Sequence, residues 1–186
     1  MKTSFLFLAD GFEEVEALTP VDILRRGGIK LETVSVMENR EVTGAHGVTV
    51  VADHLLKQVA DREVDFLIFP GGMPGALNLS ESKPLMDWLL AHFKRGGNIA
   101  AICAAPALVL GKLPLAPGVK LTCYPGFEEY LKGVQVVTDG VVKDGQFITG
   151  KGPAWAASFG LAVLEKMTDA RKAKEVAEGM LLTELK

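Results

Sequence analysis

The sequence has few cysteines and few histidines. Among its 186 residues, Cys103 and Cys123 are too few for a disulfide framework and lack zinc-site spacing, so we treat both as thiols. The three histidines, His46, His54 and His92, are scattered without metal-ligand spacing, and we interpret them as surface residues. The sequence therefore predicts no metal site.

A membrane span, a basic surface and a cleavable leader are also missing. The longest apolar run, residues 99–110, is too short to cross a membrane. Lys and Arg number 20 against 23 Asp and Glu, and the interspersed signs leave a net charge of −3, which is atypical of nucleic-acid binding. Acidic residues follow the apolar residues 5–8 at once, without a small-residue cleavage site. We expect a cytoplasmic protein without a membrane or nucleic-acid partner.

The composition, 48% apolar and 23% charged, predicts one domain over residues 1–186 with a sizeable core. Short apolar or β-branched runs predict strands, and amphipathic stretches lie between many of them. The runs are continuous rather than alternating, which is typical of a mostly parallel sheet covered on both faces. This is a doubly wound α/β pattern, a three-layer sandwich. The predicted strands are 3–8, 31–37, 48–52, 65–69, 98–102, 121–122, 134–138 and 146–149.

Two helices are predicted with glycine at their ends, one over residues 15–24 and one over 85–93. Residues 41–52 and 136–149 break the alternation, and their turn residues predict a small hairpin or meander in each. Residues 153–186 have a helical pattern. Trp88 and Trp155 lie on apolar helix faces and are predicted to pack in the core or at an interface.

Ligands of open α/β sheets bind beyond the carboxyl ends of the strands, so the segments after Leu8, Phe69 and Ile102 are the first candidates for a site. Cys103 has small residues two positions away on each side, as in a nucleophile elbow with cysteine in place of serine. A helix beginning at Pro106 is expected to lower the pKa of the thiol. The alternative is a buried structural cysteine.

Acidic and glycine-rich neighbours accompany Cys103 in the predicted crevice. Glu16 can act as general acid and base there, but Glu13 and Glu14 compete for that role, and all three can simply complement the helix N-terminus. Gly71 and Gly72 allow backbone N–H groups to approach a substrate oxygen, together with the N–H group of Ala104. The alternative for the glycines is an ordinary tight turn.

Together these loops resemble the DJ-1/ThiJ/PfpI superfamily, and specifically its DJ-1-like branch, over nearly the full length. The resemblance implies a flavodoxin-like, glutamine-amidotransferase-like sandwich that usually forms a homodimer and needs no cofactor or metal. It also implies a nucleophilic, oxidisable Cys103 with Glu16 as its acidic partner, and Gly72 and Ala104 as backbone donors. The matching segments are 9–16, 20–26, 69–72, 75–82, 100–106 and 150–153.

Members of this superfamily are described as glyoxalases that convert methylglyoxal to lactate, as deglycases of glycated substrates, and as oxidative-stress proteins whose cysteine becomes a sulfinate. The resemblance therefore implies a small aldehyde or a glycated molecule as the substrate. The alternative is a redox-sensing or chaperone-like protein in which Cys103 is oxidised without significant turnover.

The sequence departs from the superfamily pattern next to the nucleophile and at the site rim. Ala104 replaces the histidine of the peptidase-like branch, so peptidase activity is not expected. Tyr124 stands where the resemblance implies a site histidine and is interpreted as a hydrogen-bond donor or a lid. Gly71, Tyr124 and Arg26 are expected to bind the substrate or to form the rim of the site. Arg26 resembles an arginine that reaches the neighbouring subunit's site in family dimers, with an ordinary surface arginine as the alternative.

Overall fold

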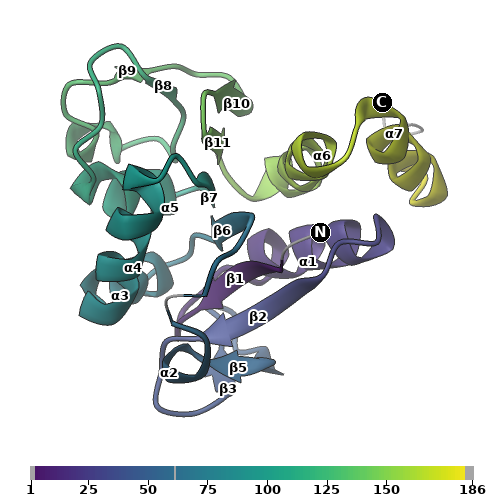
Figure 1. Ribbon diagram of the computed structural model, residues 1–186, viewed down its shortest axis with the longest axis horizontal. Helices are drawn as coiled ribbons and strands as arrows, with labels where there is room; N and C mark the ends of the chain where they lie inside the picture. The colour runs from purple at the N-terminus through teal and green to yellow at the C-terminus, as the bar shows by residue number, and fades with distance from the viewer. Residues whose placement is uncertain (1–2, 61, 183–186) are drawn as a thin grey trace.

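The computed structural model describes residues 3–60 and 62–182, which form a seven-stranded sheet with helices on both faces (Figure 1). The strand order is β10-β11-β7-β6-β1-β2-β5, and every neighbouring pair is parallel except β10 and β11. The predicted doubly wound α/β architecture is confirmed. The strands are β1 (Ser4–Leu8), β2 (Leu31–Ser35), β5 (His54–Leu55), β6 (Phe66–Phe69), β7 (Asn98–Ile102), β10 (Val141–Asp144) and β11 (Phe147–Gly150).

Helices cover the sheet on both sides. On one face α1 (Glu14–Arg26) packs beside α6 (Ala156–Met167), with α7 (Ala170–Gly179) against α6; α3 (Gly75–Glu81), α4 (Lys83–Lys94) and α5 (Ala105–Leu108) lie on the other face (Figure 1). Helices α1 and α4 match the two predicted helices. No helix within the described residues is long and apolar enough to span a membrane. Shorter helices are α2 (Leu56–Val59), η1 (Leu110–Lys112), η2 (Glu128–Tyr130) and η3 (Pro153–Trp155).

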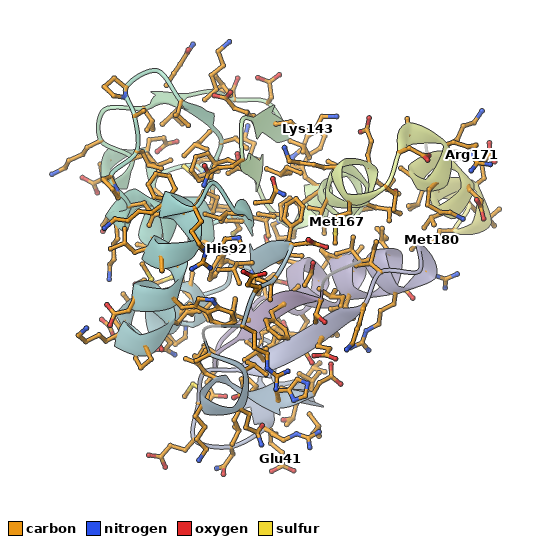
Figure 2. The ribbon with its side chains drawn as sticks, in the orientation of Figure 1. Glu41, His92, Lys143, Met167, Arg171 and Met180 are labelled. Carbon is orange, nitrogen blue, oxygen red and sulfur yellow. The ribbon has the colours of Figure 1, made fainter. Side chains whose placement is uncertain are left out.

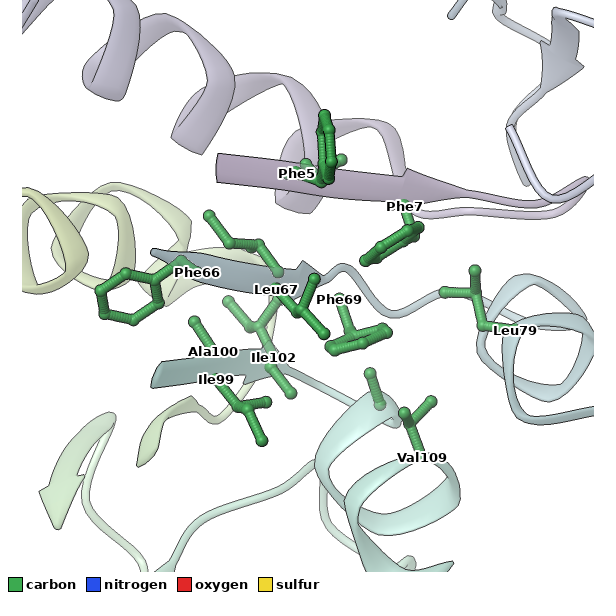
Figure 3. Packing of buried hydrophobic residues seen from close by; sticks show 14 of the residues in the cluster. Phe5, Phe7, Phe66, Leu67, Phe69, Leu79, Ile99, Ala100, Ile102 and Val109 are labelled. Atoms are coloured by element: carbon green, nitrogen blue, oxygen red, sulfur yellow. The ribbon is translucent and has the colours of Figure 1, made fainter. Parts of the chain in front are cut away.

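The core lies between the sheet and its two helical layers. Strands β1 and β6 are buried along their whole length, as their continuous apolar sequences predict. The rings of Phe7 and Phe69 stack at a centroid distance of 5.2 Å (Figure 3). Trp88 of α4 meets Phe5 and Phe7 edge-on. The prediction that Trp88 packs in the core is confirmed.

Both predicted β additions contain a hairpin. Residues 41–52 contain the expected hairpin, β3 (Glu41–Thr43) with β4 (Thr49–Val51). In residues 136–149 only β10 and β11 form a hairpin, which extends the main sheet beside β7. The predicted hairpin is therefore confirmed, while β9 (Gln135–Val136) does not extend it into a meander, because it pairs with β8 (Lys120–Leu121) in a separate parallel ladder. The N–H groups of Gln135 and Val137 donate to the carbonyl oxygens of Val119 and Leu121, which precede β9 in the chain.

The prediction of an exposed His92 is wrong, and that for Trp155 is wrong in part. His92 points into the molecule from α4 (Figure 2) and is 2% exposed, because Gly97 leaves room for its ring and the carbonyl oxygen of Asn98 bonds its Nε2 atom at 3.0 Å. Trp155 lies in η3 rather than on a long helix and is 43% exposed, so it is not part of the core of this chain, and its place at an interface stays a prediction. The helical prediction for residues 183–186 lies outside the described residues.

Candidate active site

Three loops meet where the neighbouring strands β7, β6 and β1 end. The N–H group of Glu13 donates to the carbonyl oxygen of Gly71 at 2.9 Å, and the N–H group of Gly75 donates to that of Gly11 at 3.1 Å. These bonds join the loop after β1 to the loop after β6. Cys103, in the loop after β7, packs against Gly71. The predicted convergence of the three loops is confirmed, because parallel strands bring their carboxyl ends to one edge.

Cys103 occupies a strained turn between β7 and α5. Its φ angle is 66°, in the left-handed region, which costs a residue other than glycine roughly 1–3 kcal/mol. Its N–H group donates to the carbonyl oxygen of Gly150 at 2.9 Å, and its carbonyl oxygen accepts from the N–H group of Tyr124 at 2.8 Å. The flanking Ala101 and Ala105 are fully buried. The geometry is therefore that of the predicted elbow.

Glu16 is the carboxyl group that faces Cys103. It lies in the first turn of α1 and is fully buried, although it is ionisable. Its Oε2 atom accepts a hydrogen bond from the N–H group of Gly71 at 3.0 Å, and its carboxylate is also a hydrogen-bond partner of the Cys103 thiol. Its Oε1 atom has no partner among the described residues. An unsatisfied buried oxygen this close to a thiol is suited to accept or deliver a proton.

The pKa values of this pair are shifted upward. Burial raises the pKa of Glu16 to about 7, against the hydrogen bonds from Cys103 and Gly71. Burial and the charge of Glu16 raise the pKa of Cys103 to about 12, against the N–H groups of Gly72 and Ala104. The predicted lowering of the thiol pKa is wrong, because α5 has only four residues and cannot outweigh burial beside a carboxylate. A thiolate forms here when Glu16 takes up the proton.

Glycine is required at both positions of the turn after β6. A Cβ atom at Gly71 would lie 2.5 Å from Cβ of Cys103 and 2.6 Å from Oε2 of Glu16. Gly72 has a φ angle of 91°, and a Cβ atom there would collide with the backbone of the loop after β1. The N–H groups of Gly72 and Ala104 act on the Cys103 thiol and oppose the rise of its pKa. The predicted close approach of backbone donors is therefore present, and their catalytic role stays a prediction.

Tyr124 and Arg26 have different surroundings. The backbone of Tyr124 is bonded to Cys103, while its side chain is 45% exposed, which is compatible with its predicted place at the site rim. Arg26 lies in the last turn of α1 and is exposed, with its Nε atom 2.9 Å from a carboxylate oxygen of Asp22. Within this chain it is a surface arginine, and its reach toward a second copy stays a prediction. Cys123 is buried and reduced.

A polar cluster beside the site combines the two other acidic candidates with a residue that the sequence analysis did not select. Oε2 of Glu14 lies 2.8 Å from Nδ1 of His46, and Oε2 of Glu13 lies 3.6 Å from the same atom. The three side chains offer ligand atoms within 4.8 Å of one another, the donor types of a divalent cation site. The cluster was missed because the β3–β4 hairpin alone brings His46 back to α1, and nothing in the spacing indicates that contact.

Comparisons with known proteins agree with this geometry. A family model described as the DJ-1/PfpI family matches residues 2–166. Protein dj-1beta of Drosophila melanogaster is 38% identical over 183 residues, 97% of each chain. A Caenorhabditis elegans protein named glutathione-independent glyoxalase DJR-1.2 is 31% identical over 172 residues, 91% of this chain and 90% of that protein. The solved structure of oxidized Toxoplasma gondii DJ-1 has a TM-score of 0.93 at 34% identity and covers 97% of this chain and 98% of its own.

The family model spans most of the chain, and the relatives align over nearly their full lengths. The elbow at Cys103, the buried Glu16 and the glycine turn lie within the matched residues. From its sequence and its fold, the chain belongs to the DJ-1/PfpI family.

Proposed function

We propose that this protein is a cysteine-dependent glyoxalase that needs no cofactor and converts methylglyoxal to lactate, or acts on methylglyoxal adducts as a deglycase. The observation that carries the proposal is the buried carboxylate of Glu16, which is hydrogen-bonded to the thiol of Cys103. Cys103 is the nucleophile, and Glu16 is a base with a pKa of about 7, which is suited to proton transfer at neutral pH. The name of the C. elegans relative supports the same chemistry.

In the first step the sulfur of Cys103 attacks the aldehyde carbon of methylglyoxal while Glu16 accepts the thiol proton. A carbon–sulfur bond forms and the carbonyl π bond breaks, which places a negative charge on the former aldehyde oxygen. The N–H groups of Gly72 and Ala104, which face the sulfur, are near enough to stabilise this oxyanion. The proton on Glu16 then neutralises it and gives a hemithioacetal.

In the second step Glu16 removes the proton from the former aldehyde carbon, which gives an enediolate, and delivers it to the adjacent carbon. The hydroxyl proton of the hemithioacetal moves to the neighbouring oxygen. The first carbon is oxidised and the second is reduced, so no external oxidant is needed. The product is a lactoyl thioester on Cys103. Water then attacks this thioester, releases lactate and returns the proton to the thiol. The sum of the steps is methylglyoxal plus water to lactic acid.

The test is lactate formation from methylglyoxal by the wild type and by the Cys103→Ser and Glu16→Gln variants. We expect both substitutions to abolish turnover, because each removes one half of the nucleophile and base pair. Cys123→Ser is the matched control, since it removes the other buried thiol and is expected to keep activity. Lactate formation that persists in both site variants would exclude the mechanism.

The second candidate function is redox sensing or a chaperone-like role, favoured by the donors around the sulfur. A sulfinate on Cys103 would find the N–H groups of Gly72 and Ala104 and a protonated Glu16 as hydrogen-bond donors. Mild peroxide treatment followed by mass spectrometry should then add two oxygen atoms to Cys103 and none to Cys123. Equal oxidation of both thiols, or none, would contradict this role.

We also propose that the protein forms a homodimer in the cytoplasm, where its two thiols stay reduced. Four exposed apolar side chains lie on two elements that hydrogen-bond to each other, α1 and the β3–β4 hairpin. An apolar surface of this kind on a water-soluble fold is typical of an interface. The side chains are Val15, Leu18, Val48 and Val51.

A further inference from the structure

An apolar slot with two exposed aromatic rings lies close to the backbone of Cys103. It has a volume of about 190 Å³, and its walls include Tyr124, Pro125, Gly152, Pro153 and Trp155. Tyr124 and Trp155 are 45% and 43% exposed, which is unusual for rings of this size.

Both walls of the slot are attached to Cys103 through the backbone. On one side the N–H group of Tyr124 donates to the carbonyl oxygen of Cys103 at 2.8 Å. On the other side the N–H group of Cys103 donates to the carbonyl oxygen of Gly150 at 2.9 Å, and residues 151–155 follow directly. The segments that form the slot are therefore anchored to the backbone of Cys103 on both sides.

Neighbouring contacts hold the two rings in place. The indole ring of Trp155 lies so close to Gly140 that a side-chain carbon there would overlap it, and the N–H group of Trp155 donates to the carbonyl oxygen of Gly152 at 2.9 Å. The ring of Tyr124 packs edge-on against Phe127 at a centroid distance of 6.4 Å. The Tyr124 ring packs closely on the backbone of Gly152, where a Cβ atom would lie only 3.3 Å from the ring. The slot is thus formed before any ligand binds, which lowers the entropic cost of binding.

The chemistry of the walls selects the occupant. Aromatic rings, prolines and bare backbone favour a flat apolar group, and the Lys151 ammonium at the edge is bonded to the carbonyl oxygen of Thr138 at 3.2 Å. Methylglyoxal carries only a methyl group and would leave the slot empty. We propose that the slot binds the ring of an arylglyoxal whose aldehyde carbon is attacked by Cys103, which makes aromatic 2-oxoaldehydes preferred substrates and Trp155 a specificity-determining residue. This inference rests on the proposed glyoxalase function and narrows its substrate class.

The first experiment compares kcat/KM for phenylglyoxal, measured as mandelate formed, with kcat/KM for methylglyoxal, measured as lactate formed. Water is added and the hydrogen moves between carbons as for methylglyoxal, so the reaction balances in the same way. We expect the wild type to prefer phenylglyoxal and Trp155→Ala to lower the ratio of the two values about tenfold, with Trp155→Phe restoring most of it. An unchanged ratio in Trp155→Ala, even if both activities fall, would show a merely structural role and overturn the proposal.

A second experiment separates this inference from the proposed function. Iodoacetamide and N-benzyliodoacetamide alkylate Cys103 without any turnover, and the Cys123→Ser background removes the second thiol. The benzyl reagent should react faster relative to iodoacetamide in the wild type than in Trp155→Ala, by about tenfold. If the wild type shows this selectivity but forms neither mandelate nor lactate, the result supports the aromatic slot and excludes the proposed glyoxalase function. Equal selectivity in both proteins would exclude the slot.

Discussion

At the scale of single residues, Cys103 and Glu16 form a buried acid pair that determines the reactivity of the site. The charged form of either group is disfavoured by burial, and the N–H groups of Gly71, Gly72 and Ala104 compensate only partly. Above about pH 7 the pair holds one proton, so the negative charge can pass from carboxylate to sulfur during attack. This coupling gives two predictions.

The first prediction concerns thiol reactivity. The alkylation rate of Cys103 by iodoacetamide should rise with a midpoint near pH 7, because Glu16 becomes a base when it loses its proton. Glu16→Gln should lower the rate at pH 8 on the order of 100-fold, since the buried thiol then has no base beside it. The measurement is stopped-flow or quenched alkylation in the Cys123→Ser background.

Glu13→Gln is the matched control for this measurement, because it removes a nearby carboxylate, at the N-cap of α1, that is not a partner of the thiol. A rate that depends equally on Glu13 and Glu16 would point to general charge rather than to a shared proton. A thiol that is inert at every pH would return Cys103 to a structural role.

The second prediction concerns stability. Glu16 has a pKa of 4.5 when free and about 7 when folded, so the folded chain binds the proton more tightly. The contribution of Glu16 to the free energy of unfolding is fully present below pH 4.5 and is lost as the pH rises through 7. The loss amounts to roughly 3 kcal/mol. Glu16→Gln stays neutral and can keep an acceptor for Gly71, so the free energy of unfolding of the variant relative to wild type should increase from pH 5 to pH 8.

Urea denaturation at pH 5, 6, 7 and 8 measures this difference. The substitution Glu129→Gln, at an exposed carboxyl on η2, controls for a general effect of charge. Parallel pH profiles for wild type and Glu16→Gln would show that burial does not hold the proton on Glu16.

At the scale of secondary-structure elements, the turn between β6 and α3 positions the site. It interlocks with the loop after β1 and touches both Cys103 and Glu16, so its backbone acts as a template for the pair. Its sequence carries the glycines for a steric reason, because the two loops approach more closely than a side chain allows.

The third prediction tests this template. Gly71→Ala should displace Cys103 and Glu16 from each other, because the new Cβ atom would lie 2.5 to 2.6 Å from both side chains. We expect a loss of at least tenfold in alkylation rate, together with about 1–3 kcal/mol of stability. Gly179→Ala, at the end of α7 with open space around it, is the control and should change neither. Full reactivity in Gly71→Ala would contradict the required close approach.

At the scale of the whole molecule, the two helical layers bury the apolar strands and leave α1 and the β3–β4 hairpin with exposed apolar side chains. The fourth prediction is that the protein runs at twice its chain mass of 19.9 kDa in light scattering. Val51→Glu, at a side chain that is 61% exposed, should shift the equilibrium toward the monomer, because it would bury a charge.

Tyr130→Glu, at an exposed ring on η2, is the control for general effects of a new surface charge and should leave the mass unchanged. A monomeric wild type would contradict the dimer directly. A dimer that persists in Val51→Glu would place the interface elsewhere.

Much of the fold could be predicted from local patterns. The strands around Phe5–Leu8, Phe66–Phe69 and Asn98–Ile102 are continuous apolar runs, and glycines mark the ends of α1 and α4. These features depend on neighbouring residues along the chain, so the sequence records them directly. The pairing of β9 with β8 and the burial of His92 depend on residues brought together by folding, and no periodicity indicates them.

The sequence by itself determined the parallel α/β sheet, the elbow at Cys103 and the three loops in which the site had to lie, because hydrophobic periodicity and glycine positions act locally. The family resemblance already implied Glu16 as the acidic partner, but only the tertiary structure showed that Glu16, and not Glu13 or Glu14, faces the thiol. It also reversed the expected pKa shift of the thiol and joined His46 to α1. Burial and electrostatic interaction depend on every group that surrounds a side chain, and those neighbours come from segments far apart in the chain.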